Sequence, residues 1–399
     1  MHSASLGLLS GAPKVSTKPE AESGGARTHV LGIIEAFELR GWEVHTFIAG
    51  DQISERLRRR GARELAGKHP AKRVGADLIR IGMGITNGRR AYTMLHNQVA
   101  WVYERFASFQ ALGRQFQRSG TPWILETQGL FYYEAHTERN SLQLQSLAKR
   151  IESQAYKECD VLVCVSETLR NLILKELEIE PDKVLVVPNA VDTGYFDPSR
   201  FRAKKLFDGF TVGYVGGMIR WQALDALIRA IAELASEGIP VNAVLVGDGD
   251  MRATWEAQAR DLGVAEMVKF MGRVPRDDVG HYIAGFDVAY SGQMSLKIGT
   301  MYHSPLKLYE CMAMAKPVLA TSFEDARRVV QDNATGFLID PADPSSVTDT
   351  LRRAYRAREK LPEMGRKARQ EIEQAHTWVS RVDDIIRGTN RILAERGRL

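Results

Sequence analysis

Short apolar runs alternate along the chain with longer segments whose apolar residues recur at helical spacing. Ten of these runs have the length of a strand and little polar alternation, as expected for strands that are covered on both faces. They are WEVHTFIAG (42–50), TPWILETQG (121–129), CDVLVCVS (159–166), KVLVVPN (183–189), FTVGYVGG (210–217), VNAVLVGDG (241–249), VKFMGR (268–273), FDVAYSG (286–292), KPVLATS (316–322) and GFLID (336–340). Strands that alternate with helices indicate parallel sheets, so an α/β fold is predicted.

The pattern breaks in the segment VPNAVDTGYFDPSRFRAKKLFDGF, where Pro, Gly, Asn and Asp cluster and no periodicity survives. A chain of 399 residues is long enough for two ordinary domains. We therefore predict two doubly wound, Rossmann-like domains, residues 1–195 and 196–375, followed by a helix over 376–399 whose return to the first domain stays open. Residues 11–25 are predicted to be a loop between a first strand and a helix, a usual place for ligand binding.

Composition excludes several classes of protein. The chain is 44% hydrophobic and 26% charged, as in a soluble globular protein. Its three cysteines, Cys159, Cys164 and Cys311, show no metal-ligand spacing and suggest no disulfide framework. No run approaches the roughly 18 apolar residues of a membrane span, and no export signal opens the sequence. We expect a cytoplasmic protein.

The net charge of +5 is unevenly placed. Between Arg56 and Arg90 eleven Lys or Arg stand against two acidic residues. This segment is predicted to border the acceptor side of a cleft or to contact an anionic membrane at its inner face, and a plain solvated face is the alternative. Nucleic-acid binding is not expected, because no aromatic residues interleave the arginines.

Glycine pairs occur at two predicted helix starts. Gly24 and Gly25 precede the first helix, and Gly216 and Gly217 lie between a strand and a helix. Free N–H groups, the helix dipole and the absent Cβ favour a phosphate at such turns, although an isolated pair is as often a turn without ligand. The DGD of VLVGDGDMR resembles an acidic metal motif, but Asp and Gly at a strand end are usually turn residues, so no metal is expected.

The segment MYHSPLKLYECMAMAKPVLAT predicts a short helix with a charged start. Ser304 is expected to be the N-cap and Pro305 the first helical residue, which leaves the N–H groups of Leu306 and Lys307 free for an anion. Lys307 and Glu310 then share one face of the helix. A surface salt bridge on an ordinary capped helix is the alternative.

Several segments resemble, in order, the retaining family-four glycosyltransferases of the GT-B fold. They are KVLVVPNAVD (183–192), VGYVGGMIRWQALDALI, VLVGDGD, VKFMGRVPRDDV (268–279) and SPLKLYECMAMAKPVLATS. VYERFASF (102–109) and TPWILETQGLFYYE (121–134) look like segments of one bacterial subgroup. We call it the SPxKLxE subgroup after the motif that SPLKLYE matches. The likeness spans roughly residues 24–385, nearly the whole chain.

This resemblance implies two Rossmann-like domains that face a central cleft, with the nucleotide-diphosphate sugar on the C-terminal domain and the acceptor on the N-terminal one. It implies a hexosyl- or related glycosyltransferase that needs no metal and no cofactor besides its donor. The acceptor hydroxyl would belong to a glycan, a glycolipid precursor or a secondary metabolite. In such retaining enzymes the leaving phosphate takes the acceptor proton, so no general base is required.

The resemblance also implies site residues. The donor site would comprise Gly24, Gly25, Gly216, Gly217, Asp248, Gly249, Arg273, Val274, Ser304, Leu306, Lys307 and Glu310. The residues expected to act in catalysis are Lys307, Glu310, Arg220 and Glu126, and those expected at the acceptor are Arg105 and Glu126. An ion pair of Glu126 with Arg105 that only stabilises the cleft wall is the alternative, His29 is expected to be a packing residue, and His303 a loop neighbour of the site.

The chain departs from the family pattern at three positions. The family usually has two carboxylates separated by seven residues. Glu310 matches the second, which is expected to bind the donor ribose, but Tyr302 stands at the first. The positions of two diphosphate-binding cations are Gly217 and Gln222. Lys307 is therefore expected to be the principal cation, with Arg220 as the second.

Two other classes of function stay open. A non-catalytic protein that binds sugar nucleotides would explain the missing carboxylate and cations. A nucleotide-sugar epimerase of the same fold is less expected, because its site would need several acid/base groups.

Overall fold

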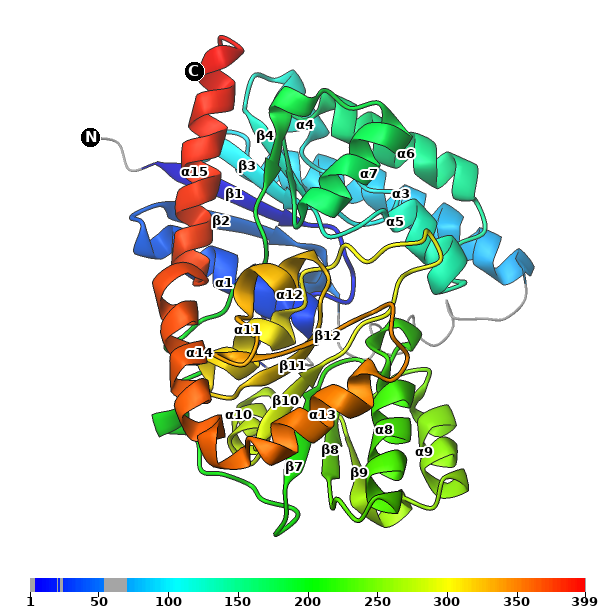
Figure 1. The fold of residues 1–399 in the computed structure, drawn as a ribbon. Helices are drawn as coiled ribbons and strands as arrows, with labels where there is room; N and C mark the ends of the chain where they lie inside the picture. Colours follow the sequence, from blue (N-terminus) through cyan, green and yellow to red (C-terminus); the bar gives the residue numbers. More distant parts are fainter. Residues whose placement is uncertain (1–3, 20, 22–23, 54–69, 399) are drawn as a thin grey trace.

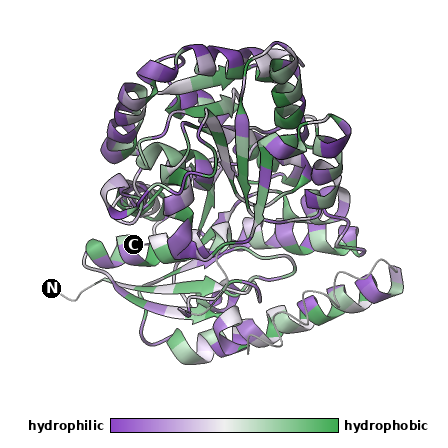
Figure 2. Cartoon of the chain, turned by 90° about the horizontal axis from the view of Figure 1, so that it is seen from below, coloured by the Kyte–Doolittle hydropathy of each residue, from purple (hydrophilic) through white to green (hydrophobic). Residues whose placement is uncertain are grey.

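The computed structural model describes residues 4–19, 21, 24–53 and 70–398. Over these residues the chain forms two α/β domains, one above the other in Figure 1, each with a six-stranded parallel sheet between layers of helices. The strands are mostly hydrophobic, and the hydrophilic segments lie mainly on the surrounding helices (Figure 2). The predicted pair of Rossmann-like domains is confirmed.

The sheet of the first domain has the strand order β2-β1-β3-β4-β5-β6. Its strands are β1 (Ser5–Ser10), β2 (Glu43–Ile48), β3 (Trp101–Arg105), β4 (Trp123–Thr127), β5 (Val161–Cys164) and β6 (Val184–Val186). The helices around it are α1 (Gly25–Leu39), α3 (Pro70–Leu95), α4 (Arg114–Arg118), α5 (Phe131–Tyr133), a π-helical turn (Glu134–Glu138), α6 (Gln145–Glu158) and α7 (Glu167–Leu177).

The sheet of the second domain has the order β12-β11-β10-β7-β8-β9. Its strands are β7 (Thr211–Val215), β8 (Asn242–Val246), β9 (Val268–Gly272), β10 (Val288–Ser291), β11 (Val318–Thr321) and β12 (Gly336–Ile339). Its helices are α8 (Leu224–Ser236), α9 (Arg252–Asp261), α10 (Arg276–Ala284), α11 (Leu306–Ala313), α12 (Glu324–Val329), α13 (Ser346–Arg356) and α14 (Leu361–Ala375). All ten predicted strands coincide with a strand of one of the two sheets.

The last helix, α15 (Trp378–Glu395), leaves the second domain and lies against α1 and β5 of the first, along the left of Figure 1. The indole of Trp378 meets the ring of His29 edge to face, with 4.9 Å between centroids. Arg40 at the end of α1 forms an ion pair of 2.5 Å with Asp383. The C-terminal helix therefore returns to the first domain and packs against α1 and β5.

The loops at the carboxyl ends of the two sheets meet, and we call this contact the domain junction. The first domain contributes the loops after β4, β5 and β6, and the second those after β7 and β10. Ser166 donates a hydrogen bond of 2.8 Å to the carbonyl of Tyr302, and the backbone N–H of Asn189 donates one of 3.0 Å to Ser304 Oγ. Ligand sites of open α/β sheets lie at such carboxyl ends.

The predicted basic segment is only partly visible. Residues 54–69, with its first six basic residues, lie outside the described residues, and the rest of the segment belongs to α3. None of the helices in the described ranges is both long and apolar enough to cross a membrane.

Candidate donor site at the domain junction

The second sheet has its topological switch point between β7 and β10, where the strand order reverses. Ligands of doubly wound sheets bind in the crevice outside the carboxyl ends of the strands at this point. The loop after β7 carries Gly216 and Gly217, and the long loop after β10 ends at Ser304, just before α11. The sequence therefore places its phosphate-friendly glycines and its Ser-Pro-x-Lys segment side by side.

Two glycine turns pack directly on one another beside this point. Gly247 has a φ of 134°, and a Cβ there would overlap the carbonyl oxygen of Gly216. The side chain of Asp248 accepts a hydrogen bond of 2.9 Å from the N–H of Gly249, and the backbone N–H of Met218 donates one of 3.0 Å to the Asp248 carbonyl. Asp248 thus stabilises the turn locally. Across the described residues there is no group of three or more His, Cys, Asp or Glu that could hold a metal ion.

The N-termini of two helices from different domains converge at the junction. α1 begins at Gly25, with the exposed Gly24 as its N-cap and no side-chain cap bond. α11 begins at Leu306, whose Cδ1 lies 3.3 Å from the place where a Cβ on Gly25 would be. Both helices direct free N–H groups and the positive end of the dipole toward this contact, which favours an anion.

The prediction that Ser304 caps α11 is wrong. The N-cap is Pro305, with extended backbone and no side-chain cap bond. Ser304 is buried, and its hydroxyl accepts the Asn189 N–H and donates to Asp325 Oδ2 at 2.7 Å. The amide of Asn189 also donates to the Ser304 carbonyl at 2.6 Å. Ser304 therefore holds the start of α11 against the crossover between the domains.

Lys307 is buried at the first turn of α11. Its ammonium donates a hydrogen bond to Gln222 Oε1 and lies 5.2 Å from the ring centre of Tyr214. Burial lowers the pKa of Lys307 to about 8, and the nearby Cys311 and Glu310 only partly oppose this effect. Gln222 stands where the family resemblance predicts a cation, so Lys307 brings a cation to the same place from another element.

Glu310 lies one turn further along α11 and is half-buried. Burial raises its pKa to about 7, while Arg276 and Lys307 pull in the opposite direction. The structure shows no ion pair between Glu310 and Lys307, both of which it describes. The carboxylate is therefore left available, in a setting where a hydroxyl donor would stabilise its charged form.

Arg276, which sequence reasoning missed, also faces this site. Its guanidinium lies 4.0 Å from the ring centre of Tyr195, and its buried Nε lacks a hydrogen-bond partner in the described structure. The residues predicted for the donor site in this segment were instead Arg273 and Val274. Arg273 is exposed, and the half-buried Val274 packs against the core of the second domain. A second arginine at the start of α10, in VPRDD, was the available signal.

Arg220 is held by the first domain. Its Nη2 lies 2.9 Å from Glu138 Oε2, and the same carboxylate accepts the N–H of Lys297 at 2.6 Å. The Arg220 side chain is 40% exposed. Arg220 is thus neither a plain solvated arginine nor free for a phosphate in this arrangement, and a ligand would have to replace Glu138.

Three polar side chains gather on the first-domain side: Arg105 and Glu126 at the carboxyl ends of β3 and β4, and His29 from α1. Glu126 Oε1 lies 2.7 Å from Nε2 of His29 on α1, so the pairing expected with Arg105 is instead made with His29. Burial raises the pKa of Glu126, but His29 and Arg105 together bring it below its ordinary value. One buried polar atom on each side chain is unpartnered among the described residues: His29 Nδ1, Arg105 Nε and Glu126 Oε2. Such atoms are suited to a hydroxyl-rich ligand.

Two family models divide the chain between them. The model described as "Glycosyltransferase Family 4" matches residues 23–195, and the one described as "Glycosyl transferases group 1" matches residues 197–371. The chain belongs to the group 1/family 4 class of GT-B glycosyltransferases. The SPxKLxE subgroup stays a prediction.

Individual relatives of this glycosyltransferase are distant. A D-inositol 3-phosphate glycosyltransferase of Corynebacterium jeikeium is 24% identical over 83% of this chain and 83% of its own length. The UDP-Gal:alpha-D-GlcNAc-diphosphoundecaprenol alpha-1,3-galactosyltransferase of Escherichia coli is 26% identical over 69% of this chain and 70% of its own.

Two solved structures share the fold. One is Anabaena HepE in complex with UDP and glucose, with a TM-score of 0.68 at 16% identity, covering 97% of this chain and 100% of HepE. The other is the sucrose-phosphate synthase of Thermosynechococcus elongatus, with a TM-score of 0.69 at 16% identity, covering 98% of this chain and 100% of that one.

In this glycosyltransferase a carboxylate of the first domain, Glu134, contacts the residue that stands in place of the missing one. Tyr302 is buried and donates a hydrogen bond of 2.9 Å to Glu134 Oε1, to which His303 Nε2 also lies at 3.0 Å. Arg139 pairs with the other oxygen at 2.9 Å. His303 is thus more than a loop neighbour, because it joins the two domains through Glu134.

Proposed function

We propose that the chain is a retaining glycosyltransferase that moves a hexose or related sugar from a nucleotide diphosphate to an acceptor hydroxyl, without a metal ion. The observation that carries this proposal is the buried ammonium of Lys307, set where the N-termini of α1 and α11 converge. A buried cation beside two positive helix ends favours a multiply charged anion, and a diphosphate leaving group is such an anion.

The named relatives suggest which donor to test first. HepE was solved with UDP and glucose, and the galactosyltransferase of Escherichia coli is named for UDP-Gal. We therefore propose a UDP-hexose as donor, with its diphosphate near Lys307 and its ribose hydroxyls on Glu310. The Glu310 carboxylate forms no side-chain hydrogen bond or ion pair with the described residues. Burial raises its pKa to about 7 because it disfavours the charged form, and a hydrogen bond from a ribose hydroxyl would stabilise that form.

The reaction can then proceed without a protein base. The bond between the anomeric carbon and the phosphate oxygen breaks, and the acceptor oxygen bonds to the same face of that carbon. The acceptor proton passes to the leaving phosphate oxygen. Lys307 and the helix ends stabilise the growing charge of the diphosphate. Glu126, with its unpartnered Oε2, is proposed to orient the acceptor hydroxyl or a sugar hydroxyl, with Arg105 beside it.

A thermal-shift screen of nucleotide-diphosphate sugars, followed by an assay of nucleoside diphosphate release, tests the proposal. A donor at a hundred times its dissociation constant should add about 2.7 kcal/mol to the free energy of unfolding. Slow release of UDP in the absence of acceptor supports an enzyme. A donor that stabilises the protein but is never turned over would favour the non-catalytic binding protein, and a product with an isomerised sugar still on its nucleotide would favour the epimerase.

A further inference from the structure

One helix of the first domain exposes an unusual amount of apolar surface. Among the described residues seven large apolar side chains are classed as exposed, and four of them lie on α3: Leu78, Ile79, Ile85 and Met94, at 57%, 57%, 56% and 49% exposure. Single exposed apolar residues need no explanation, but a cluster on one helix marks a surface that contacts something else. Leu147 on α6 is exposed as well.

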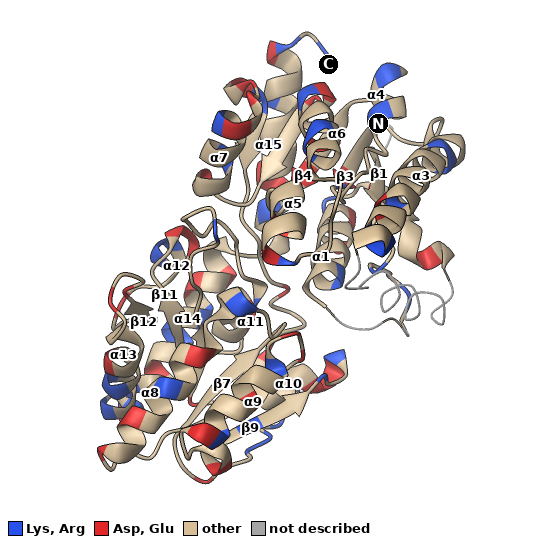
Figure 3. Ribbon diagram, turned by 90° about the vertical axis from the view of Figure 1, so that its right-hand side faces the viewer, with Lys and Arg blue, Asp and Glu red and all other residues tan. Residues whose placement is uncertain are grey.

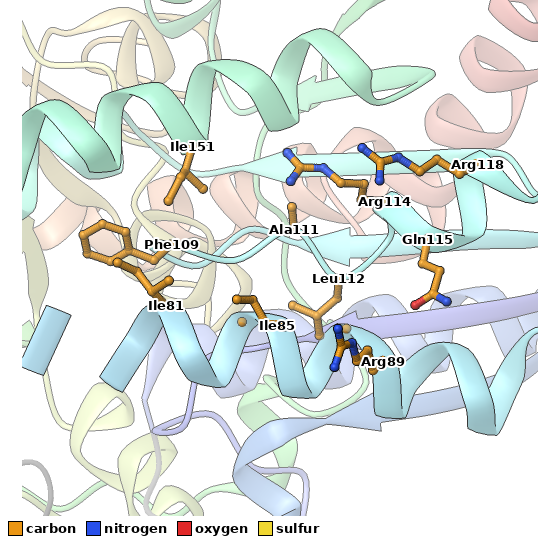
Figure 4. A pocket seen from close by; sticks show the side chains of 12 residues that line it. Ile81, Ile85, Arg89, Phe109, Ala111, Leu112, Arg114, Gln115, Arg118 and Ile151 are labelled. Atoms are coloured by element: carbon orange, nitrogen blue, oxygen red, sulfur yellow. The ribbon is translucent and has the colours of Figure 1, made fainter. Parts of the chain in front are cut away.

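An open groove of about 680 Å³ runs beside this face of α3. Figure 4 shows it between α3 and the segment 109–118, with Ile151 of α6 closing one end. The lining is mainly apolar, with Ile81, Ile85, Phe109, Ala111, Leu112 and Ile151. A Cβ on Gly84 would lie 2.6 Å from the carbonyl oxygen of Phe109, so a small residue is required for the loop to approach the helix this closely.

The rim of the groove is basic. Arg89 projects from α3, and Arg114 and Arg118 from the opposite side (Figure 4). Arg114 pairs with Glu158, and Arg118 lies 3.8 Å from the same carboxylate, while one buried nitrogen of Arg114 has no hydrogen-bond partner. In the part of the chain that the structure describes, Arg89 makes no ion pair. Basic residues recur along α3, α4 and α6 (Figure 3), and the described residues that line the groove include no carboxylate, although Glu158 lies beside two of its arginines.

We propose that this face, formed by α3 with the rim of the groove, docks the protein on a membrane surface that contains anionic phospholipid. An interfacial helix places its apolar side chains at the boundary of the acyl chains and its basic side chains at the phosphates. Leu78, Ile79 and Ile85 provide the first element, and Arg89, Arg90 and the rim arginines the second. The charge complementarity favours a bilayer of anionic lipid over an uncharged partner.

Co-sedimentation of the full chain with vesicles tests this docking directly. We expect binding at low salt to phosphatidylcholine vesicles that contain about 30% phosphatidylglycerol, and little binding to phosphatidylcholine alone. About 0.5 M NaCl should release the protein, because it shortens the Debye length to about 4 Å and screens the attraction. Each arginine near an anionic surface contributes about fivefold in affinity. Arg89→Gln with Arg90→Gln should therefore weaken binding about 25-fold.

The apolar contribution is tested separately, and a matched pair of changes on the other domain is the control. Leu78→Ser, Ile79→Ser and Ile85→Ser together should weaken binding at least about tenfold. These side chains are more than half exposed, so the melting temperature should stay close to that of the wild type. Leu262→Ser with Arg260→Gln changes an exposed leucine and an exposed arginine of the second domain and should leave vesicle binding unchanged.

A fluorescent probe shows whether α3 itself meets the membrane. The three native cysteines are free and buried, so a thiol-reactive probe on the Ile85→Cys variant should label the helix selectively. Its emission should shift to the blue on anionic vesicles. No sedimentation with anionic vesicles at low salt, or sedimentation without a blue shift, would overturn the proposal. These measurements read binding only, so their failure and a failure of the proposed glycosyl transfer are distinguishable.

Discussion

Replacing Lys307 by Met removes a buried charge while it keeps the volume of the side chain. The pKa of Lys307 is lowered from 10.5 to about 8, so the folded protein holds this proton less tightly than the unfolded chain does. Burial of the charge therefore destabilises the fold fully below about pH 8, and this effect disappears as the pH rises toward 10.5. From pH 7 to pH 9.5 the group should add about 2 kcal/mol to the free energy of unfolding.

Urea unfolding at the two pH values measures this contribution. The gain from pH 7 to pH 9.5 should be about 2 kcal/mol smaller in Lys307→Met than in the wild type. Although Lys307→Met removes the cost of burying a charge, it should lower turnover. The leaving diphosphate loses a cation that acts mainly on the transition state, so we expect about a hundredfold loss in kcat and a smaller change in the donor dissociation constant.

Lys316→Met is the matched control. Burial also lowers the pKa of Lys316. This residue lies just before the amino end of β11, away from the junction, and its ammonium donates a hydrogen bond to the carbonyl of Ala284. The turnover of Lys316→Met should stay near that of the wild type.

Arg220→Ala should lose less turnover than Lys307→Met, because Arg220 is held by Glu138. A crippled Arg220→Ala with a nearly normal Lys307→Met would refute the role given to Lys307.

Three further predictions concern donor, metal and acceptor. Glu310→Gln should weaken donor binding by about 1.5–3 kcal/mol in a calorimetric titration, and wild-type donor affinity should fall as the pH drops through about 7, where the carboxylate protonates. EDTA should leave turnover unchanged, and restoration of a lost activity by manganese would contradict this. Glu126→Gln should raise the acceptor KM more than the donor dissociation constant, and equal effects on both would argue against an acceptor role.

The sheets were predictable because strands buried on both faces of a parallel sheet carry uninterrupted apolar runs. β3 was not among the predicted runs, since Glu104 and Arg105 interrupt its apolar residues. The two oxygens of Glu104 accept the N–H groups of Leu112 and Gly113, both at 2.9 Å, and burial raises the pKa of this carboxyl to about 7. A buried carboxylate bonded to a following loop leaves no periodic trace in the sequence.

The charged start of α11 was predictable from its local residues, but the long-range contacts of the site were not. Ser304 looked like a helix cap because capping is the commonest use of a serine before a helix. Its partners, Asn189 and Asp325, are 115 and 21 residues away, and the contact with Asn189 depends on how the two domains meet. The contact of His29 with Glu126 was hidden for a related reason: the two residues are far apart in the sequence, and only the packing of α1 beside β4 within the first domain brings them together.

A crystal structure of the protein with a bound nucleoside diphosphate tests the central claim most directly. We predict that the β-phosphate lies between the N-termini of α1 and α11, that Lys307 Nζ leaves or shares Gln222 to bond a phosphate oxygen, and that Glu310 accepts a ribose hydroxyl. A diphosphate bound elsewhere, with Lys307 still on Gln222 alone, would contradict the account.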